Sequence, residues 1–410
     1  MKQNRFASPA ECRPLCDRRG RIGLACILAL LLAALPAALA ENAEQTSFEQ
    51  MVLVYMVGSD LEDEGGMASR DISEMLGSGF DEESTCILLM AGGSNAWALD
   101  IPVAQNCIYR LEDGGLNKLI ELPDTSMGDA STMESFLHYA SDYADARRSG
   151  LILWDHGYGP MEGFGRDTRH ADACLTLSEL TQALDAAQYR PDWIGFDACL
   201  MNSAETASAL APYAGCLIAS QETEPGEGWN YSFLGSLTPE MDGGAVGECV
   251  VAAYFDHYAA QYAGYEQLMP MLSMSCIDLT RIGAVEAALD ALFSQLGADI
   301  GDELYSDIVR ARLEARGVGT FTTTTDYDLV DLIDCIDRLA DLYPEDCARA
   351  RAAVEDCILV NRSNVERLGG ISVYFPYNNI PLFLSRWGST GEAIGCSEGY
   401  RSFLHDYALL

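Results

Sequence analysis

The chain is short of basic residues and of histidine. Its 410 residues include 25 Lys and Arg against 62 Asp and Glu, so the formal net charge is −37, and only 5 residues are His. A surface of this sign repels polyanions, which excludes nucleic acid and anionic membranes as expected partners. The acidity fits an exported soluble protein, or one that attracts cationic peptides.

The 14 cysteines contain no Cys-x-x-Cys pair and no zinc-ligand spacing. Three of them lie in the first 40 residues, which leaves an odd number, eleven, in the rest of the chain. Disulfides plus one free thiol are one reading of that number in an exported protein. Cysteines inside apolar runs, such as Cys86, are instead typical of small buried hydrophobes, so the disulfide content stays open.

The N-terminal segment has the features of an export signal. A basic stretch at residues 18–21 precedes an apolar run at residues 22–35, and an A-x-A cleavage motif ends at Ala40. The run is too short and ends too abruptly for a membrane span. We therefore expect residues 1–40 to be a signal peptide that is removed on export, with an uncleaved N-terminal anchor as the alternative.

Short apolar runs alternate with helical patterns from about residue 50 onward. Each run ends at turn residues, which indicates strands that are buried on both faces. The runs cover residues 51–57, 85–91, 151–154, 193–196 and 216–220. Capping boxes at residues 131–134 and 176–179 predict the starts of helices, and another helix is expected to begin near Asn202. This repetition predicts an α/β fold with a mostly parallel sheet and helices on both faces.

The second half of the chain is predicted to be richer in helices. Helices are expected over residues 244–263 and 281–296, a strand over 271–277, mostly helical structure over 300–365 and a strand near 368–376. We therefore expect a main α/β domain over residues 41–297. A helical subdomain over residues 298–410 would follow, and its strand near 368–376 would pack on the main domain.

His156 and Cys199 each follow a predicted strand directly, one helix-plus-strand unit apart. Ligands bind outside the carboxyl ends of the strands in open parallel sheets, so these two side chains are expected to face each other there. The N-terminus of the next helix would lower the pKa of the Cys199 thiol. The alternative is that Cys199 is one more buried cysteine. The other four histidines have no comparable setting.

Gly157 follows His156 and carries no side chain that would obstruct a substrate backbone. Its amide, together with that of Cys199, would donate hydrogen bonds to an oxyanion. A simple turn is the alternative reading of this glycine. The three residues together favour nucleophilic catalysis by a thiol, with a histidine that exchanges protons with it.

Five segments between about residues 50 and 376 resemble the clostripain family of cysteine peptidases. They are residues 54–62 (VYMVGSDLE), 154–157 (WDHG), 196–201 (FDACLM), 225–229 (PGEGW) and 370–376 (GISVYFP). WDHG and FDACLM are specific in combination, and the other three are weaker alone. The resemblance implies a caspase-like three-layer α/β/α sandwich. It also implies a His156/Cys199 pair without an obligatory third member, and cleavage after basic residues.

Acidic residues close to Cys199 would hold the basic P1 side chain that the resemblance implies. Asp197 lies two residues before Cys199, and Glu227 and Trp229 lie in a loop after the next strand, so we expect these three residues to bind substrate. A pair of carboxylates would grip a guanidinium in a bidentate fork, which favours Arg over Lys. The family commonly has Asp in that loop, so the preference between Arg and Lys stays open. The alternatives are a helix cap for Asp197 and a surface turn for Glu227.

The resemblance also implies two optional properties. Some members depend on calcium, for which the acidic run at residues 60–64 would supply oxygen ligands, with a solvated charge run as the alternative. No cofactor is expected for the chemistry itself. Some members cut themselves, and here Arg166 and Arg169 would be the P1 residues in a Gly-rich segment, residues 163–170, that we expect to be exposed. An ordinary uncut loop is the alternative.

Three functions remain open on the sequence alone. The first is a secreted or cell-surface cysteine endopeptidase that cleaves after Arg or Lys. The second is a caspase-like peptidase with another P1 preference, and the third is a non-catalytic surface or binding protein on the same fold. The expected partners of a peptidase are peptides or proteins, without nucleic acid and without a membrane once the signal is removed. The oligomeric state is not predicted.

Overall fold

The computed structural model describes residues 46–112, 114–319 and 327–410. The expected signal peptide, residues 1–40, lies outside the described residues, so export and cleavage stay predictions. Within the described ranges, no helix combines the length and the apolar character that crossing a membrane requires.

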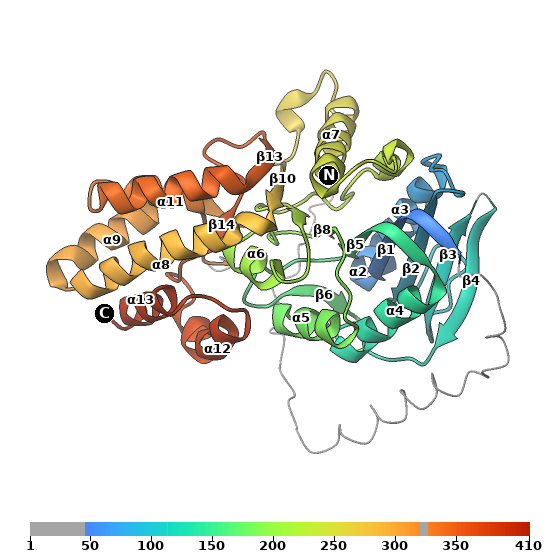
Figure 1. The fold of residues 1–410 in the computed structure, drawn as a ribbon, viewed down its shortest axis with the longest axis horizontal. Coiled ribbons are helices and arrows are strands. Elements are labelled where there is room, and N and C mark those ends of the chain that lie inside the picture. Colours follow the sequence, from blue (N-terminus) through green and yellow to red (C-terminus); the bar gives the residue numbers. More distant parts are fainter. Residues whose placement is uncertain (1–45, 113, 320–326) are drawn as a thin grey trace, which may run out of the picture.

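The described part of the chain forms a nine-stranded main sheet, in the order β13-β10-β9-β8-β5-β1-β2-β3-β4 (Figure 1). The five strands in its centre run parallel to one another. They are β1 (Ser47–Val57), β2 (Thr85–Gly92), β5 (Asp145–Trp154), β8 (Trp193–Asp197) and β9 (Cys216–Ala219). Antiparallel strands complete the two edges, namely β3 (Asn106–Glu112) and β4 (Gly115–Leu122) on one side, and β10 (Ser273–Asp278) and β13 (Ile358–Ser363) on the other. The predicted α/β class with a mostly parallel sheet is confirmed.

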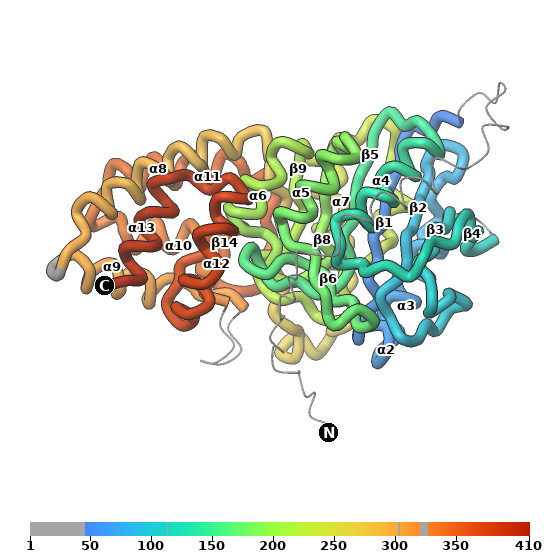
Figure 2. The backbone as a smooth tube through the Cα atoms, turned by 90° about the horizontal axis from the view of Figure 1, so that it is seen from below, coloured from blue at the N-terminus to red at the C-terminus, as the bar shows by residue number. Residues whose placement is uncertain are grey.

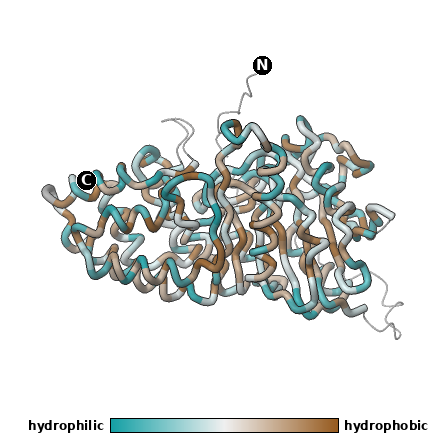
Figure 3. The backbone as a smooth tube through the Cα atoms, turned by 90° about the horizontal axis from the view of Figure 1, so that it is seen from above, coloured by the Kyte–Doolittle hydropathy of each residue, from teal (hydrophilic) through white to brown (hydrophobic). Residues whose placement is uncertain are grey.

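Helices cover both faces of the main sheet and give three layers. Alternate residues of β1 point to opposite faces, so Leu53 and Tyr55 join one hydrophobic cluster and Val52 and Val54 join another. The first cluster includes side chains of α4 (Ala130–Tyr143), α5 (Leu177–Ala186) and α6 (Ala204–Leu210), and we call this side the α4–α6 face. The second includes α3 (Met67–Gly77) and α7 (Gly243–Gln261) and is the α3/α7 face. In Figure 3, brown hydrophobic stretches of the backbone run through the middle of the molecule. The expected three-layer sandwich is confirmed.

The C-terminal helices gather beyond the β10–β13 edge, at the opposite end of the molecule from β4 (Figures 1 and 2). They are α8 (Ile282–Asp299), α9 (Asp302–Glu314), α10 (Leu332–Leu339), α11 (Pro344–Cys357), α12 (Ile380–Ala393) and α13 (Glu398–Leu409). A small sheet of β11 (Gly317–Val318), β12 (Leu329–Asp331) and β14 (Ser372–Tyr374) lies among them. The expected domain boundary at residues 297–298 falls inside α8, and the division into two domains stays a prediction.

Two predicted elements of the C-terminal part differ from the structure. Residues 358–363, expected to be helical, form β13 and pair with β10, because the β-branched Ile358 and Val360 favour an edge strand. The strand expected near 368–376 is limited to β14 and pairs with β12 in the small sheet. The hairpin of β3 and β4 was not predicted at all, because β4 is largely solvent-accessible and lacks a buried apolar run.

The three helices predicted from capping residues are present as α4, α5 and α6, but only one of the predicted caps forms as expected. The capping box at residues 176–179 is present, with Thr176 and Glu179 bonded reciprocally. The box expected at residues 131–134 is absent, because α4 already begins at Ala130 without a side-chain cap. The helix expected near Asn202 begins at Ala204, because Ser203 supplies the cap.

Candidate active site

The register of β5 and β8 brings His156 and Cys199 to the same point of the sheet edge. The two strands are parallel, with Trp154 opposite Asp197. The Asp155 amide donates to the Asp197 carbonyl oxygen at 3.4 Å, which extends the pairing by one residue. His156 and Cys199 each lie two residues beyond the last pair. The strand-end rule predicts this placement from the sequence.

Gly157 lies directly against the backbone of Cys199. A Cβ atom at residue 157 would be 1.9 Å from the carbonyl oxygen of Cys199 and 3.0 Å from its amide nitrogen. Both neighbours are backbone atoms that cannot rotate away, so only glycine allows this approach. The contact shows directly that the two strand ends meet.

Replacing Gly157 by Ala is therefore expected to push the two strand ends apart. We expect a loss of stability of about 1–3 kcal/mol from overpacking, and a fall in kcat/KM of about 10²-fold or more, because misplaced catalytic groups are costly. Gly283→Ala is the matched control, since a Cβ there meets open space. Urea denaturation and peptide hydrolysis measure the two effects, and wild-type kcat/KM in Gly157→Ala would contradict the prediction.

The carboxylate of Asp60 holds His156. The sequence had indicated Asp60 only as part of the acidic run at residues 60–64. The Nε2 atom of His156 lies 3.0 Å from Oδ1 of Asp60, in α2 (Ser59–Gly65). Burial lowers the pKa of His156, but the hydrogen bond from Asp60 and the charges of Asp155 and Asp60 outweigh burial and raise that pKa above its ordinary value. The same hydrogen bond lowers the pKa of Asp60 to about 2. The available signal in the sequence was the position of Asp60 just after a strand end.

The half-buried thiol of Cys199 contacts the backbone of Glu224. The Glu224 amide donates to Sγ at 3.2 Å, and Sγ lies 3.8 Å from the Glu224 carbonyl oxygen. Burial, and then the negative charge of Glu224, raise the pKa of the thiol to about 12. The expected lowering by a helix N-terminus is wrong, because α6 begins only at Ala204 and Ser203 already caps it.

Three buried carboxyl groups lie close together on the α3/α7 face, and we call Asp71, Asp197 and Glu224 the acidic cluster. Asp197 accepts hydrogen bonds from the Trp229 amide at 3.0 Å and from the Tyr231 hydroxyl at 2.7 Å. Burial raises the pKa of Asp197 to about 7. These bonds rule out the alternative that Asp197 caps the next helix.

The other two members of the cluster are also kept from ionising freely. Asp71 accepts a hydrogen bond from Nε1 of Trp154 at 2.7 Å, and burial and the charge of Asp197 raise its pKa well above the ordinary value. Both carboxylate oxygens of Glu224 are buried without a hydrogen bond to a described residue. Burial, then the charge of Asp197, raise the pKa of Glu224, and the nearby Ala198 amide offsets only part of this. A buried, unpaired carboxylate of this kind favours a cationic ligand.

Neither of the other two predicted substrate-binding residues adds a free carboxylate or an accessible side chain to this cluster. The carboxylate of Glu227 lies 3.5 Å from both Arg70 and His257, and it accepts a hydrogen bond from Gln261 at 2.8 Å. Trp229 is 1% exposed and fills the core of the α3/α7 face, so its indole cannot reach a substrate. Glu224, three residues before Glu227, lies against Cys199 instead.

The predicted self-cleavage segment is folded into the structure. Arg166 lies in β6 (Phe164–Asp167), and its guanidinium is 3.3 Å from Asp60 and 3.2 Å from Asp172. No residue of the segment 163–170 is exposed, so the expected exposure is wrong. The segment is partly buried because acidic side chains pair with its arginines, as Asp60 and Asp172 do with Arg166.

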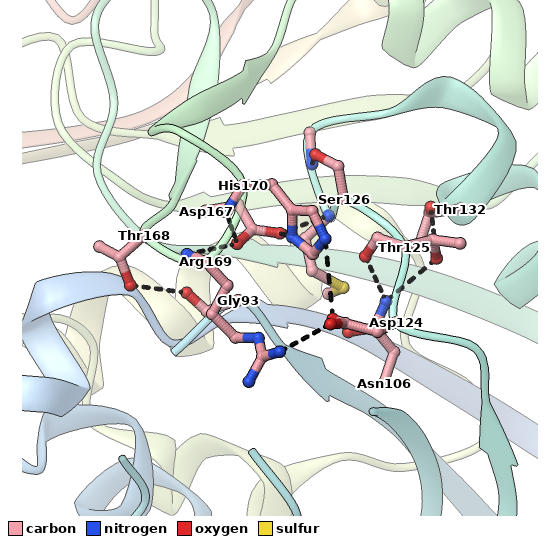
Figure 4. Close-up of polar contacts among 12 residues, drawn as sticks. Gly93, Asn106, Asp124, Thr125, Ser126, Thr132, Asp167, Thr168, Arg169 and His170 are labelled. Atoms are coloured by element: carbon pink, nitrogen blue, oxygen red, sulfur yellow. Dashed lines mark hydrogen bonds and ion pairs between the residues drawn. The ribbon is translucent and has the colours of Figure 1, made fainter. Parts of the chain in front are cut away.

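A polar network anchors the far end of this segment (Figure 4). Arg169 lies 2.6 Å from a carboxylate oxygen of Asp124. The carboxylate of Asp167, which is fully buried, accepts bonds from the amides of Met127, Arg169 and His170 and lies 2.9 Å from Nδ1 of His170. The segment is therefore tied to the loop that precedes α4.

The acidic run at residues 60–64 does not fit a calcium site in this arrangement. Asp60 is bonded to His156, Glu62 accepts hydrogen bonds from Ser69, and Asp63 accepts them from the amide of Asn95. Across the described ranges, no group of three or more His, Cys, Asp or Glu is arranged to hold a metal ion.

Comparison with known proteins gives matches in both sequence and structure. The model of the clostripain family matches residues 54–404. Clostripain of Hathewaya histolytica is 25% identical over 217 residues, which are 45% of this chain and 41% of clostripain, so the matched part spans less than half of that relative.

Solved structures of two proteases share the fold. A secreted C11 cysteine protease of Bacteroides thetaiotaomicron, in complex with an irreversible peptide inhibitor, is 18% identical with a TM-score of 0.66, over 85% of this chain and 100% of that chain. An inactive zymogen of a C11 protease from Parabacteroides distasonis is 18% identical with a TM-score of 0.65, over 86% and 99%. The model of the clostripain family matches most of the length of the chain, and the solved structures share its fold. The chain therefore belongs to the clostripain family of cysteine proteases.

Proposed function

We propose that the chain is a cysteine endopeptidase that cleaves after basic residues, with Cys199 as nucleophile and His156 as its proton-transfer partner. The backbone contact between Gly157 and Cys199 carries this proposal, because it joins the two strand ends that bear the reactive side chains. A thiol and an imidazole at the carboxyl edge of a parallel sheet are suited to attack on a peptide carbonyl.

The chemistry follows from the protonation states. With the pKa of the thiol at about 12, Cys199 is protonated at rest, so its proton passes to His156 as the sulfur attacks the carbonyl carbon. The amides of Gly157 and Cys199 would stabilise the oxyanion, and each such donor typically contributes ~2.7–4 kcal/mol. His156 then gives the proton to the leaving amine. Water hydrolyses the resulting thioester and restores the thiol.

The acidic cluster supports a basic P1 residue. Glu224 contacts Cys199 through its backbone and presents a carboxylate without a hydrogen-bonded partner among the described residues. A guanidinium or ammonium group bound there would pair with Glu224 and Asp197 and relieve the repulsion within the cluster. A neutral or acidic P1 side chain would leave these carboxylates unpaired.

A panel of fluorogenic peptides that differ only at P1 tests the proposal, run with calcium and with a chelator. We expect Arg and Lys peptides to be hydrolysed and Leu, Asn and Asp peptides to be poor substrates, with no loss of rate in chelator. Preference for Asn or Asp at P1 would instead favour a caspase-like peptidase with another P1 preference. No hydrolysis of any peptide, with an unreactive Cys199, would favour a non-catalytic binding protein.

Export through the N-terminal signal is part of the same proposal. The basic stretch, the apolar run and the motif that ends at Ala40 support it. N-terminal sequencing of the protein recovered outside the cell should begin at Glu41.

Self-cleavage after Arg169 should be limited by the polar network that holds it. Asp124→Asn removes the charge partner of Arg169, so we expect this variant to split into two chains faster than the wild type. Asp142→Asn, at an exposed residue of α4, is the control. Denaturing gels and sequencing of the new N-terminus at His170 measure the rate. An active preparation that stays a single chain in all three proteins would contradict the prediction.

A further inference from the structure

We infer that Asp60 is a positioning residue for catalysis, which holds His156 by Nε2 and leaves Nδ1 to exchange a proton with Cys199. The inference rests on the proposed roles of His156 and Cys199, and it adds a third member to a pair for which the family resemblance requires none. The Nε2–Oδ1 distance of 3.0 Å is that of a good hydrogen bond.

The chain is built to place Asp60 at this point. The preceding residue, Ser59, is buried and has φ of +50°, a left-handed conformation that is uncommon outside glycine. Its hydroxyl donates to Oδ1 of Asp155 at 2.6 Å. Two neighbouring contacts, Ser59 with Asp155 and Asp60 with His156, therefore join the start of α2 to the end of β5. Such a backbone conformation persists only where the surroundings fix it.

The orientation of the Asp60 carboxylate is fixed from its other side as well. Oδ2 lies 3.3 Å from Nη1 of Arg166, which in turn pairs with Asp172. The two oxygens of Asp60 thus have separate partners, one on the imidazole and one on the guanidinium. A carboxylate held in this way fixes both the ring orientation and the tautomer of His156.

Charged groups from three parts of the chain act on the pKa of His156. Asp60 from α2 and Asp155, just after β5, favour the imidazolium, and Arg166 from β6 opposes it. The ring of Tyr158 lies 6.1 Å from the imidazole. Asp60 stays ionised throughout the working range of pH, because its hydrogen bond to His156 lowers its pKa to about 2. Removing its charge should therefore lower the pKa of His156.

The test compares Asp60→Asn with Asp63→Asn. Asp63 is the matched control, because it lies in the same helix and accepts hydrogen bonds from the amides of Asn95 and Ala96, as a purely structural carboxylate does. We expect Asp60→Asn to lower kcat by about 10²-fold or more with little change in KM. In an NMR titration of ¹³C-labelled histidine, the pKa of His156 should fall in Asp60→Asn and stay raised in Asp63→Asn.

Two further variants distinguish failure of the positioning role of Asp60 from failure of the proposed function. Asp60→Glu keeps the charge, so it should retain a raised pKa at His156 with intermediate kcat, and it replaces Asp60→Asn if that variant does not fold. Wild-type kcat and an unchanged pKa of His156 in Asp60→Asn would overturn the positioning role. Activity that survives in Cys199→Ala would instead overturn the proposed function itself.

Discussion

Replacing Cys199 by Ala is expected to abolish peptide hydrolysis while leaving the fold intact. The thiol accepts a hydrogen bond only from the Glu224 amide among the described residues, so its loss removes little structure. The fall in kcat should be on the order of 10⁶-fold, as in other enzymes whose nucleophile and base act as a unit. His156→Ala should be nearly as severe, and the double variant should be no worse than either.

The control for this prediction is Cys249→Ala, a partly exposed cysteine in α7. It should keep wild-type activity. Circular dichroism and thermal unfolding show whether Cys199→Ala is folded, and a continuous assay with an Arg peptide measures the rate. Hydrolysis by folded Cys199→Ala at the wild-type rate would show that another group performs the reaction.

Neutralising the acidic cluster is expected to abolish the preference for a basic P1 residue. Losing one partner of a buried charge contact costs about 2–5 kcal/mol, so Glu224→Gln and Asp197→Asn should each lower kcat/KM for Arg peptides by roughly 30- to 4,000-fold. Peptides with a neutral P1 residue should be affected far less. Glu227→Gln is the matched control, because that carboxylate is engaged by Arg70 and Gln261.

Alkylation of Cys199 gives an independent readout of the same cluster. The charge of Glu224 raises the pKa of the thiol, so Glu224→Gln should lower that pKa and speed labelling by a small uncharged alkylator. Unfolding would also expose this buried thiol and speed labelling, so thermal unfolding must show that Glu224→Gln is folded. An unchanged P1 preference in both Glu224→Gln and Asp197→Asn would contradict the role of the cluster.

The pH dependence of the P1 preference follows from the same groups. The pKa of Asp197 is about 7, so the free enzyme holds this carboxyl largely protonated below that pH, and a cationic P1 side chain needs it ionised. The ratio of kcat/KM for Arg over neutral peptides should therefore rise as the pH increases through about 7. Asp197→Asn should flatten this rise.

The sheet and the reactive pair were predictable because each depends on short segments of sequence. Buried parallel strands appear as continuous apolar runs, and the rule on strand ends then places His156 and Cys199 together. Gly157 was found because it follows His156 directly. None of these inferences required knowledge of how a loop folds.

Residues that meet through loops could not be predicted. Asp60 contacts His156 only because the left-handed Ser59 turns α2 toward the end of β5. Glu224 and Glu227 lie in one loop, and only its folded path shows which carboxylate is buried beside Cys199. The segment with Arg166 looked exposed because Asp60, one of its acidic partners, lies 106 residues away in the sequence.

An irreversible peptidyl ketone with Arg at P1 tests the central claim most directly. After reaction with the whole protein, intact-mass spectrometry and peptide mapping locate the adduct. The account predicts a single adduct on Cys199, which is lost in Cys199→Ala, strongly slowed in His156→Ala and weakened in Glu224→Gln. An adduct on another cysteine while Cys199 stays free, or no adduct at all on an enzyme that cleaves Arg peptides, would contradict it.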